Sequence, residues 1–263
     1  MKRDNLVWGV LLVVLGGLLL LDNMGLLPRS INIWSLFWPL ALIGLGVSWV
    51  IGSFSGSGQR EKLSIPLEGA ESARVKFQHG AGELHINDAA APDQLLDGAF
   101  SGGVVSDVRR DSGEVRVDLR IPDGSFTWPF GPGRVLDWRV GLDRQTPLTL
   151  EIEGGANHIL LDLRNLRVRE LRVETGASST EIQFPTQAGE TRARVQAGAA
   201  SVDMQVPQGV AAHIQVKGAL STTQIDQARF VRVGDGYESP DYASAENRLD
   251  LVVETGVGSL SIR

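Results

Sequence analysis

Apolar and polar residues alternate along much of the second half of the chain, and small-residue corners interrupt the alternation about every twenty residues. The clearest stretches are LEIEGGANHILLDL, LRVETGASSTEIQFP, ARVQAGAASVDMQVP and LVVETGVGSLSIR. Strict alternation is typical of β-strands with one face toward a core and one toward solvent. A short repeat period indicates units that stack on one another. The pattern therefore predicts a mainly β domain, a single β-solenoid.

Alignment of these stretches on their corners gives each residue a predicted direction. The aligned corner residues are Gly80, Gly155, Gly176, Gly198 and Gly256, with Ala219 in a further copy. The positions three before the corner are expected to point inward and are Phe77, Ile152, Val173, Val195, Val216 and Val253. The positions four after it are also expected to point inward and include Leu84, Ile159, Thr180, Val202, Thr223 and Leu260. Polar residues between them, such as Glu153 and Glu254, are expected to form a solvated face.

The segment 88–147 departs from the repeat and is predicted to be an irregular insertion in a β domain that spans residues 61–263. It keeps strand-like runs in EVRVDLRI and VLDWRVGL. Between them lies PDGSFTWPFGPGR, a loop rich in proline and glycine that carries Phe126, Trp128 and Phe130. Aromatic residues on a loop are expected either to cover an open end of the core or to contact a partner or the bilayer interface.

Two long apolar runs lie within residues 1–51. LVWGVLLVVLGGLLLL and IWSLFWPLALIGLGVSWVI contain no charged residue, and a membrane-spanning helix needs about twenty apolar residues. They predict a transmembrane hairpin with helices at about residues 6–23 and 33–51. A cleaved signal peptide is the alternative for the first run, but no A-x-A site follows it. Residues 52–60, which contain GSFSGSG, are expected to form a flexible linker.

Tryptophan and glycine residues mark the expected positions of this hairpin. Tryptophan is enriched where a helix crosses the membrane–water interface, and glycine lets two helices approach closely. The expected interface anchors are Trp8, Trp34, Trp38 and Trp49. The expected helix-packing positions are Gly16, Gly17, Gly44 and Gly46.

Basic residues flank the hairpin on the side of its two ends. Lys2 and Arg3 precede it and Arg60 and Lys62 follow it, whereas Arg29 stands alone in the connection. Loops rich in lysine and arginine stay in the cytoplasm. The charges therefore predict a cell-membrane protein with two spans whose ends and β domain are cytoplasmic.

Charge, cysteine content and motifs narrow the function classes. The chain carries a net charge of −6, which is poorly suited to binding nucleic acid. It contains no cysteine, which excludes disulfides, thiolate catalysis and cysteine-based zinc sites. The HExxH, GxSxG, Walker A and dinucleotide motifs are all missing from the sequence. We therefore expect a protein that is not an enzyme and that uses no cofactor and no metal.

Histidines and carboxylates remain as candidates for chemistry. The four histidines take four different positions relative to the corner, which argues against a shared metal site and favours surface or loop positions. They are His79, His85, His158 and His213. Glu153 and Glu174 are expected to be neighbours on successive coils, as paired acids are in polysaccharide-cleaving β-helix proteins. Gln196 at the adjoining position breaks this row, so a solvated face is the favoured interpretation.

The residues of both regions carry a resemblance to a bacterial architecture. GVLLVVLGGLLLLDNMGLL followed by SLFWPLALIGLGV is similar to the paired transmembrane region of LiaI- and LiaF-type membrane proteins. ETGASSTEIQFP, AGAASVDMQVPQGV and ETGVGSLSIR resemble the adhesin-like toastrack β-solenoid domain. The resemblance implies a role in cell-envelope stress responses, often by restraining or informing a membrane histidine kinase. It implies no catalytic residues.

We therefore expect a membrane-anchored sensory, regulatory or scaffold protein that sits in the lipid bilayer and acts through protein–protein contacts. A membrane sensor kinase and a second copy of the chain are the candidate partners. One alternative is a structural protein that self-assembles at the cell envelope. A less favoured alternative is a glycan-binding or glycan-active β-helix protein.

Overall fold

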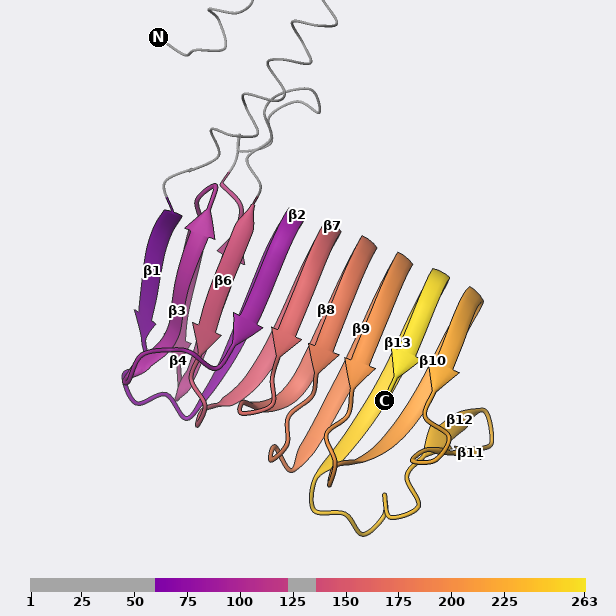
Figure 1. Cartoon of the computed structure of the whole chain (residues 1–263). Coiled ribbons are helices and arrows are strands. Elements are labelled where there is room, and N and C mark those ends of the chain that lie inside the picture. Colours follow the sequence, from indigo (N-terminus) through magenta and orange to yellow (C-terminus); the bar gives the residue numbers. More distant parts are fainter. Residues whose placement is uncertain (1–59, 123–135) are drawn as a thin grey trace, which may run out of the picture. The chain divides into compact units, whose positions relative to one another are not determined.

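A computed structural model of the chain describes residues 60–122 and 136–263. These residues form one sheet in which hydrogen-bonded neighbours follow the order β1-β3-β6-β2-β7-β8-β9-β13-β10-β12-β11 (Figure 1). The predicted helices at 6–23 and 33–51 and nearly all of the linker lie outside the described residues. Within the described parts, no helix has the length and apolar character needed to cross a membrane. The mainly β fold of the domain is confirmed.

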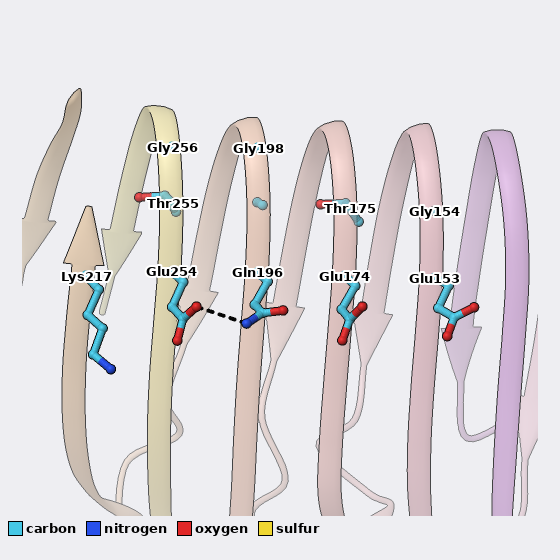
Figure 2. Close-up of a pocket in the computed structure, with 11 residues that line it drawn as sticks. Glu153, Gly154, Glu174, Thr175, Gln196, Gly198, Lys217, Glu254, Thr255 and Gly256 are labelled. Atoms are coloured by element: carbon cyan, nitrogen blue, oxygen red, sulfur yellow. Dashed lines mark hydrogen bonds between the residues drawn. The ribbon is translucent and has the colours of Figure 1, made fainter. Parts of the chain in front are cut away.

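A row of long strands makes up most of the sheet. They are β2 (Ser72–Asn87), β7 (Pro147–Asp162), β8 (Arg167–Gln183), β9 (Glu190–Gln205), β13 (Arg248–Ile262) and β10 (Ala211–Ile225). Each long strand pairs in parallel with the next one in the row. Figure 2 shows the strands that carry Glu153, Glu174, Gln196 and Glu254 bending over at their corners, so that one strand contributes two arms. The stack is therefore built from bent strands joined by short turns.

The corners line up in the register that the sequence alignment predicts. Parallel pairing places Gly155 beside Gly80 on one side and beside Gly176 on the other. The reason for glycine is steric, because a Cβ atom on Gly155 would lie 2.6 Å from the carbonyl oxygen of Gly80. The same holds farther along the row, where a Cβ atom on Gly256 would lie 2.5 Å from the carbonyl oxygen of Gly198. At Gly155, Gly176, Gly198 and Gly256, the absence of a side chain allows the corners to stack at the strand spacing.

The predicted inward rows form the core. Phe77, Ile152, Val173, Val195 and Val253 are buried three positions before the corner. Leu84, Ile159, Thr180, Val202 and Leu260 are buried four positions after it. The exceptions are in β10, where Val216 is half-buried and Thr223 is exposed. The interior therefore runs along the whole stack and opens at β10.

The prediction that segment 88–147 is an irregular insertion was wrong, because the segment contributes strands to the sheet. Its described residues, 88–122 and 136–147, contain the strands β3 (Gln94–Ser101), β4 (Val105–Asp111), β5 (Glu114–Arg120) and β6 (Asp137–Leu142). β6 and β5 extend the sheet beside different halves of β2, and β3, β1 (Arg60–Pro66) and β4 continue it by antiparallel pairing. Trp138 and Phe100 are fully buried between them, with ring centroids 5.1 Å apart. These strands pair out of sequence order and are short, so they leave no repeat period.

The last strand of the chain is not the last strand of the stack. β13 lies between β9 and β10 and pairs in parallel with both (Figure 1). The connection from β10 to β13 forms the small hairpin of β11 (Val231–Val233) and β12 (Gly236–Glu238). β12 pairs with the start of β10. β10 thus becomes the outermost long strand.

Candidate interaction surface

The outward residues two positions before the corner form one row across the long strands. From β2 to β10 this row contains Gln78, Glu153, Glu174, Gln196, Glu254 and Lys217. Most of these side chains line an open groove of about 1030 Å³ beside the corners. Figure 2 shows them projecting on the same side of neighbouring strands. We call this row the corner ladder; its members have the outward direction that the sequence predicts.

Glu153 is the most strongly bound acid of the corner ladder. Lys76 Nζ lies 2.6 Å from its Oε1 atom, and Gln78 Nε2 donates a hydrogen bond of 2.9 Å to Oε2. The hydrogen bonds from Gln78 and Lys76 lower the pKa of Glu153 below its ordinary value. A general acid needs the opposite, a raised pKa that keeps its proton near neutral pH. The surroundings of Glu153 therefore favour a charged structural partner over an acid catalyst.

The far end of the corner ladder holds a second network. Gln196 Nε2 donates to Glu254 Oε2 over 2.9 Å, and Arg194 Nη2 lies 3.3 Å from Glu254 Oε1 (Figure 2). Glu174, between the two networks, has no hydrogen-bonded or ionic side-chain partner among the residues that the structure describes, and neither does Lys217. These exposed charges remain available to a polar partner. The described residues contain no group of three or more His, Asp or Glu side chains that could hold a metal ion.

The prediction that the histidines lie on the surface or in loops was wrong for His79, which is buried. Its side chain is 1% exposed and packs against Trp138 with ring centroids 5.0 Å apart. Desolvation by this burial lowers the pKa of His79 to about 4. The neutral ring is therefore part of the core at physiological pH.

Asn157 completes this buried polar cluster and was not predicted from the sequence. Its Nδ2 atom donates 2.7 Å to the His79 carbonyl oxygen and lies 3.3 Å from His79 Nδ1. Both residues sit inside the corner, where the two arms of the strands meet. The sequence did carry a signal for the burial of His79. His79 lies two positions after the inward Phe77, and residues two apart on a strand face the same side. Asn157 likewise lies two positions before the inward Ile159.

The other histidines lie where a surface interpretation places them. His85 and His158 are half-buried on outward rows of the second arm. His213 Nδ1 lies 2.9 Å from Glu238 Oε2 and so joins β10 to β12. His85 and His158 lie on the neighbouring strands β2 and β7, two positions apart in register, whereas His213 lies at the start of β10 at the other end of the row.

The remaining site predictions fall outside the described residues. This applies to the interface anchors Trp8, Trp34, Trp38 and Trp49 and to the helix-packing positions Gly16, Gly17, Gly44 and Gly46. It also applies to the loop residues Phe126, Trp128 and Phe130. These assignments stay predictions from the sequence.

Comparison with known protein families shows to which family the chain belongs. The family model of the N-terminal domain of toast_rack, DUF2154, matches residues 54–205, which is more than half of the chain. The chain belongs to the toast_rack family. Residues 6–50, ahead of the toast_rack domain, match the model of the LiaI-LiaF-like transmembrane region. The predicted architecture of a LiaI/LiaF-like membrane region followed by a toastrack domain is therefore confirmed.

One solved structure shares the fold of the β domain. A crystal structure of a candidate cell adhesion protein from Clostridium sporogenes aligns with a TM-score of 0.68 at 17% identity, covering 78% of this chain and 98% of that chain. This likeness shows a shared fold and nothing more. A candidate adhesin from Bacteroides fragilis aligns over 79% of this chain and 99% of that chain at 11% identity, with a TM-score of 0.27 that carries no argument. No curated protein matches the sequence.

Proposed function

We propose that this toast_rack protein is a non-enzymatic, membrane-anchored regulator of the bacterial cell-envelope stress response. It acts by contact with a membrane partner, and a sensor histidine kinase is the partner that the architecture favours. One observation carries the proposal, namely the LiaI-LiaF-like transmembrane region at residues 6–50 joined to a toast_rack domain at 54–205 in the same chain.

The chemistry of the corner ladder supports binding over catalysis. Two of its three acids accept charged or amide hydrogen bonds, Glu153 from Lys76 and Gln78 and Glu254 from Gln196 and Arg194. The parallel stack fixes the spacing of neighbouring side chains at about 4.8 Å, which gives a rigid pattern of charge and amide groups. A preorganised polar surface of this kind contributes specificity toward a protein partner because less order is lost on binding.

The β domain is proposed to lie in the cytoplasm. The support is the placement of Lys2, Arg3, Arg60 and Lys62 at the ends of the hairpin against Arg29 alone in the connection. Fusions of alkaline phosphatase and of green fluorescent protein to the C-terminus test this in cells. We expect fluorescence without phosphatase activity, and the reverse result would overturn the orientation.

Crosslinking in membranes tests the regulatory role. The full chain with a C-terminal tag is crosslinked in cells of its host and purified in detergent, and mass spectrometry identifies its partners. We expect a membrane histidine kinase to be enriched over a control that carries the hairpin substitutions Gly44→Leu and Gly46→Leu, because bulky side chains block close helix packing. We also expect deletion of the gene to change the output of an envelope-stress promoter. Recovery of no kinase together with an unchanged promoter would overturn the proposal.

A further inference from the structure

The outer edge of β10 is open along most of its length. β10 pairs along both of its arms with β13 on one side, whereas on the other side only His213 and Ile214 are paired, with β12. Among the described residues, no strand covers the outer side of the backbone from Gln215 to Ile225. The free N–H and C=O groups of such an edge are a template for another strand.

This edge lacks the protection that the opposite edges carry. Native strand edges are usually protected by charged side chains and proline, which discourage pairing with other chains. β1, with the sequence REKLSIP, has three charges and a proline in seven residues. β4, with the sequence VSDVRRD, has four charges in seven residues. From Gln215 to Ile225 the sequence QVKGALSTTQI has one charge, Lys217, and no proline.

The interior of the stack is also unfinished at β10. Thr223 is exposed, although the same position is buried in every other long strand, as at Thr180 and Leu260. Val216 is half-buried, whereas its neighbour Val253 in β13 is fully buried. One more strand on this side would cover both Val216 and Thr223. The edge therefore offers incompletely buried inward positions as well as free backbone groups.

We propose that a second copy of this chain covers the edge through antiparallel pairing of β10 with β10. β13 runs toward its corner along one arm and away from it along the other (Figure 2). β10 follows it, because β10 keeps a parallel register with both arms of β13. A two-fold axis through the two corners therefore places the first arm of each copy against the second arm of the other, with opposite directions. Residues that face each other across an antiparallel pair point to the same side. The inward rows continue if Val216 lies opposite Thr223 of the second copy.

This register suits two identical edges. It places Lys217 opposite Thr222 and Gln215 opposite Gln224, so the two lysines do not face each other. Every contact occurs twice, as the symmetry of an isologous dimer requires. A head-to-tail stack would instead place β10 against the charged β1 and β4 edges, each of which spans only seven residues. A symmetric pair is therefore favoured over a filament.

Disulfide crosslinking tests the pairing, because the natural chain has no cysteine. Two differently tagged full-length copies, Lys217→Cys and Thr222→Cys, are expressed together and oxidised in membranes. Opposed residues in an antiparallel pair have Cα atoms about 4.5–5.5 Å apart, within the range of a disulfide. We expect a dimer that carries both tags, at least about tenfold more abundant than with Lys217→Cys and Arg109→Cys on the β4 edge. Equal yields, or no mixed dimer, would overturn the proposal.

A charge placed in the inward row tests the register. Thr223→Asp puts a carboxylate on an exposed position of the free chain but against Val216 in the dimer, so the fold should be kept. We expect the crosslink yield to fall at least about a hundredfold, since a buried unpaired charge is strongly unfavourable. Gln224→Asp adds the same charge on the outward side and should change the yield by less than about threefold. Full crosslinking of Thr223→Asp, or crosslinking of this edge to a different protein, would overturn the pairing. Neither result depends on a kinase, so failure here is distinguishable from failure of the proposed function.

Discussion

Replacing the corner glycines by alanine is predicted to lower the stability of the domain by amounts that differ from one corner to the next. Replacing each corner glycine by alanine adds one Cβ atom that meets the carbonyl oxygen of the neighbouring corner. The distance would be 3.0 Å for Gly176, 2.8 Å for Gly198, 2.6 Å for Gly155 and 2.5 Å for Gly256. Ordinary contacts begin at 3.4 Å, so the shortfall is largest at Gly256. The obstacle is backbone in every case and cannot rotate away.

The size of the effect follows from the hydrogen bonds at the corner. Moving one strand outward by nearly 1 Å would break about two interstrand hydrogen bonds, each of which contributes about 0.5–1.5 kcal/mol. Gly256→Ala should therefore destabilise the domain by about 1–3 kcal/mol, or lower its melting temperature by roughly 3–10 °C, and Gly176→Ala by less. Circular dichroism of the strand signal during heating of the full chain in detergent measures the change.

Gly80 provides the matched control for this series. A Cβ atom on Gly80 would meet only the Cδ1 atom of Ile121, at 3.6 Å. Gly80→Ala should therefore be neutral or stabilise by about 0.4–1 kcal/mol through the lower entropy of the unfolded chain. The steric account is refuted if Gly256→Ala and Gly80→Ala have the same melting temperature. It is also refuted if Gly176→Ala lowers the melting temperature more than the other three corner substitutions do.

Two further predictions concern the core and the turn beside β10. Burial lowers the pKa of His79 to about 4, so the unfolded chain binds the proton more readily and stability falls as the pH drops from about 6.5 to 4. His79→Gln should therefore reduce the loss of stability between pH 7 and pH 4.5, measured by urea unfolding, by about 2 kcal/mol. An unchanged difference between the two pH values would contradict this, and His158→Gln serves as the control. Arg229 donates from Nη1 to the Val206 carbonyl oxygen over 2.6 Å and from Nη2 to the Pro207 carbonyl oxygen over 3.0 Å. Arg229→Lys should therefore lose about 1–2 kcal/mol because an ammonium group cannot make both bonds in this geometry, whereas the exposed Arg232→Lys should be neutral in the same assay.

The repeat could be aligned from sequence because two independent constraints coincide at each corner. Glycine is required where corners stack, and the inward positions recur at fixed offsets from it, as Phe77 and Leu84 do from Gly80. The direction of His79 also follows from parity, but a surface or loop position was predicted because the four histidines take different positions relative to the corner. Its burial depends on Trp138 and Asn157, which come from strands distant in sequence. The alternation of apolar and polar residues within one strand does not reveal contacts between strands that are distant in the sequence.

The segment 88–147 shows a second limit of sequence reasoning. Its strands are six to eight residues long, and β6 pairs with β2 and β3, neither of which is adjacent to it in the chain. Short strands with distant partners carry little periodic signal, because alternation over a few residues identifies a strand but not its neighbour. Phe100 and Trp138 face each other in the β3–β6 pair and are buried together, although they are 38 positions apart in the sequence.

The position of β13 is the feature that connects the fold to its open edge. β13 follows β10 in the chain, yet Val253 and Leu260 lie between the inward rows of β9 and those of β10. β13 is therefore the long strand that pairs with β10, and the connection through β11 and β12 pairs with the start of β10 on its other side. If β13 had stacked outside β10, the outermost inward residue four positions after the corner would be Leu260 instead of Thr223. A threonine at this place tolerates water in the free chain and accepts a second strand in the dimer, which is the property that a reversible β10 interface requires.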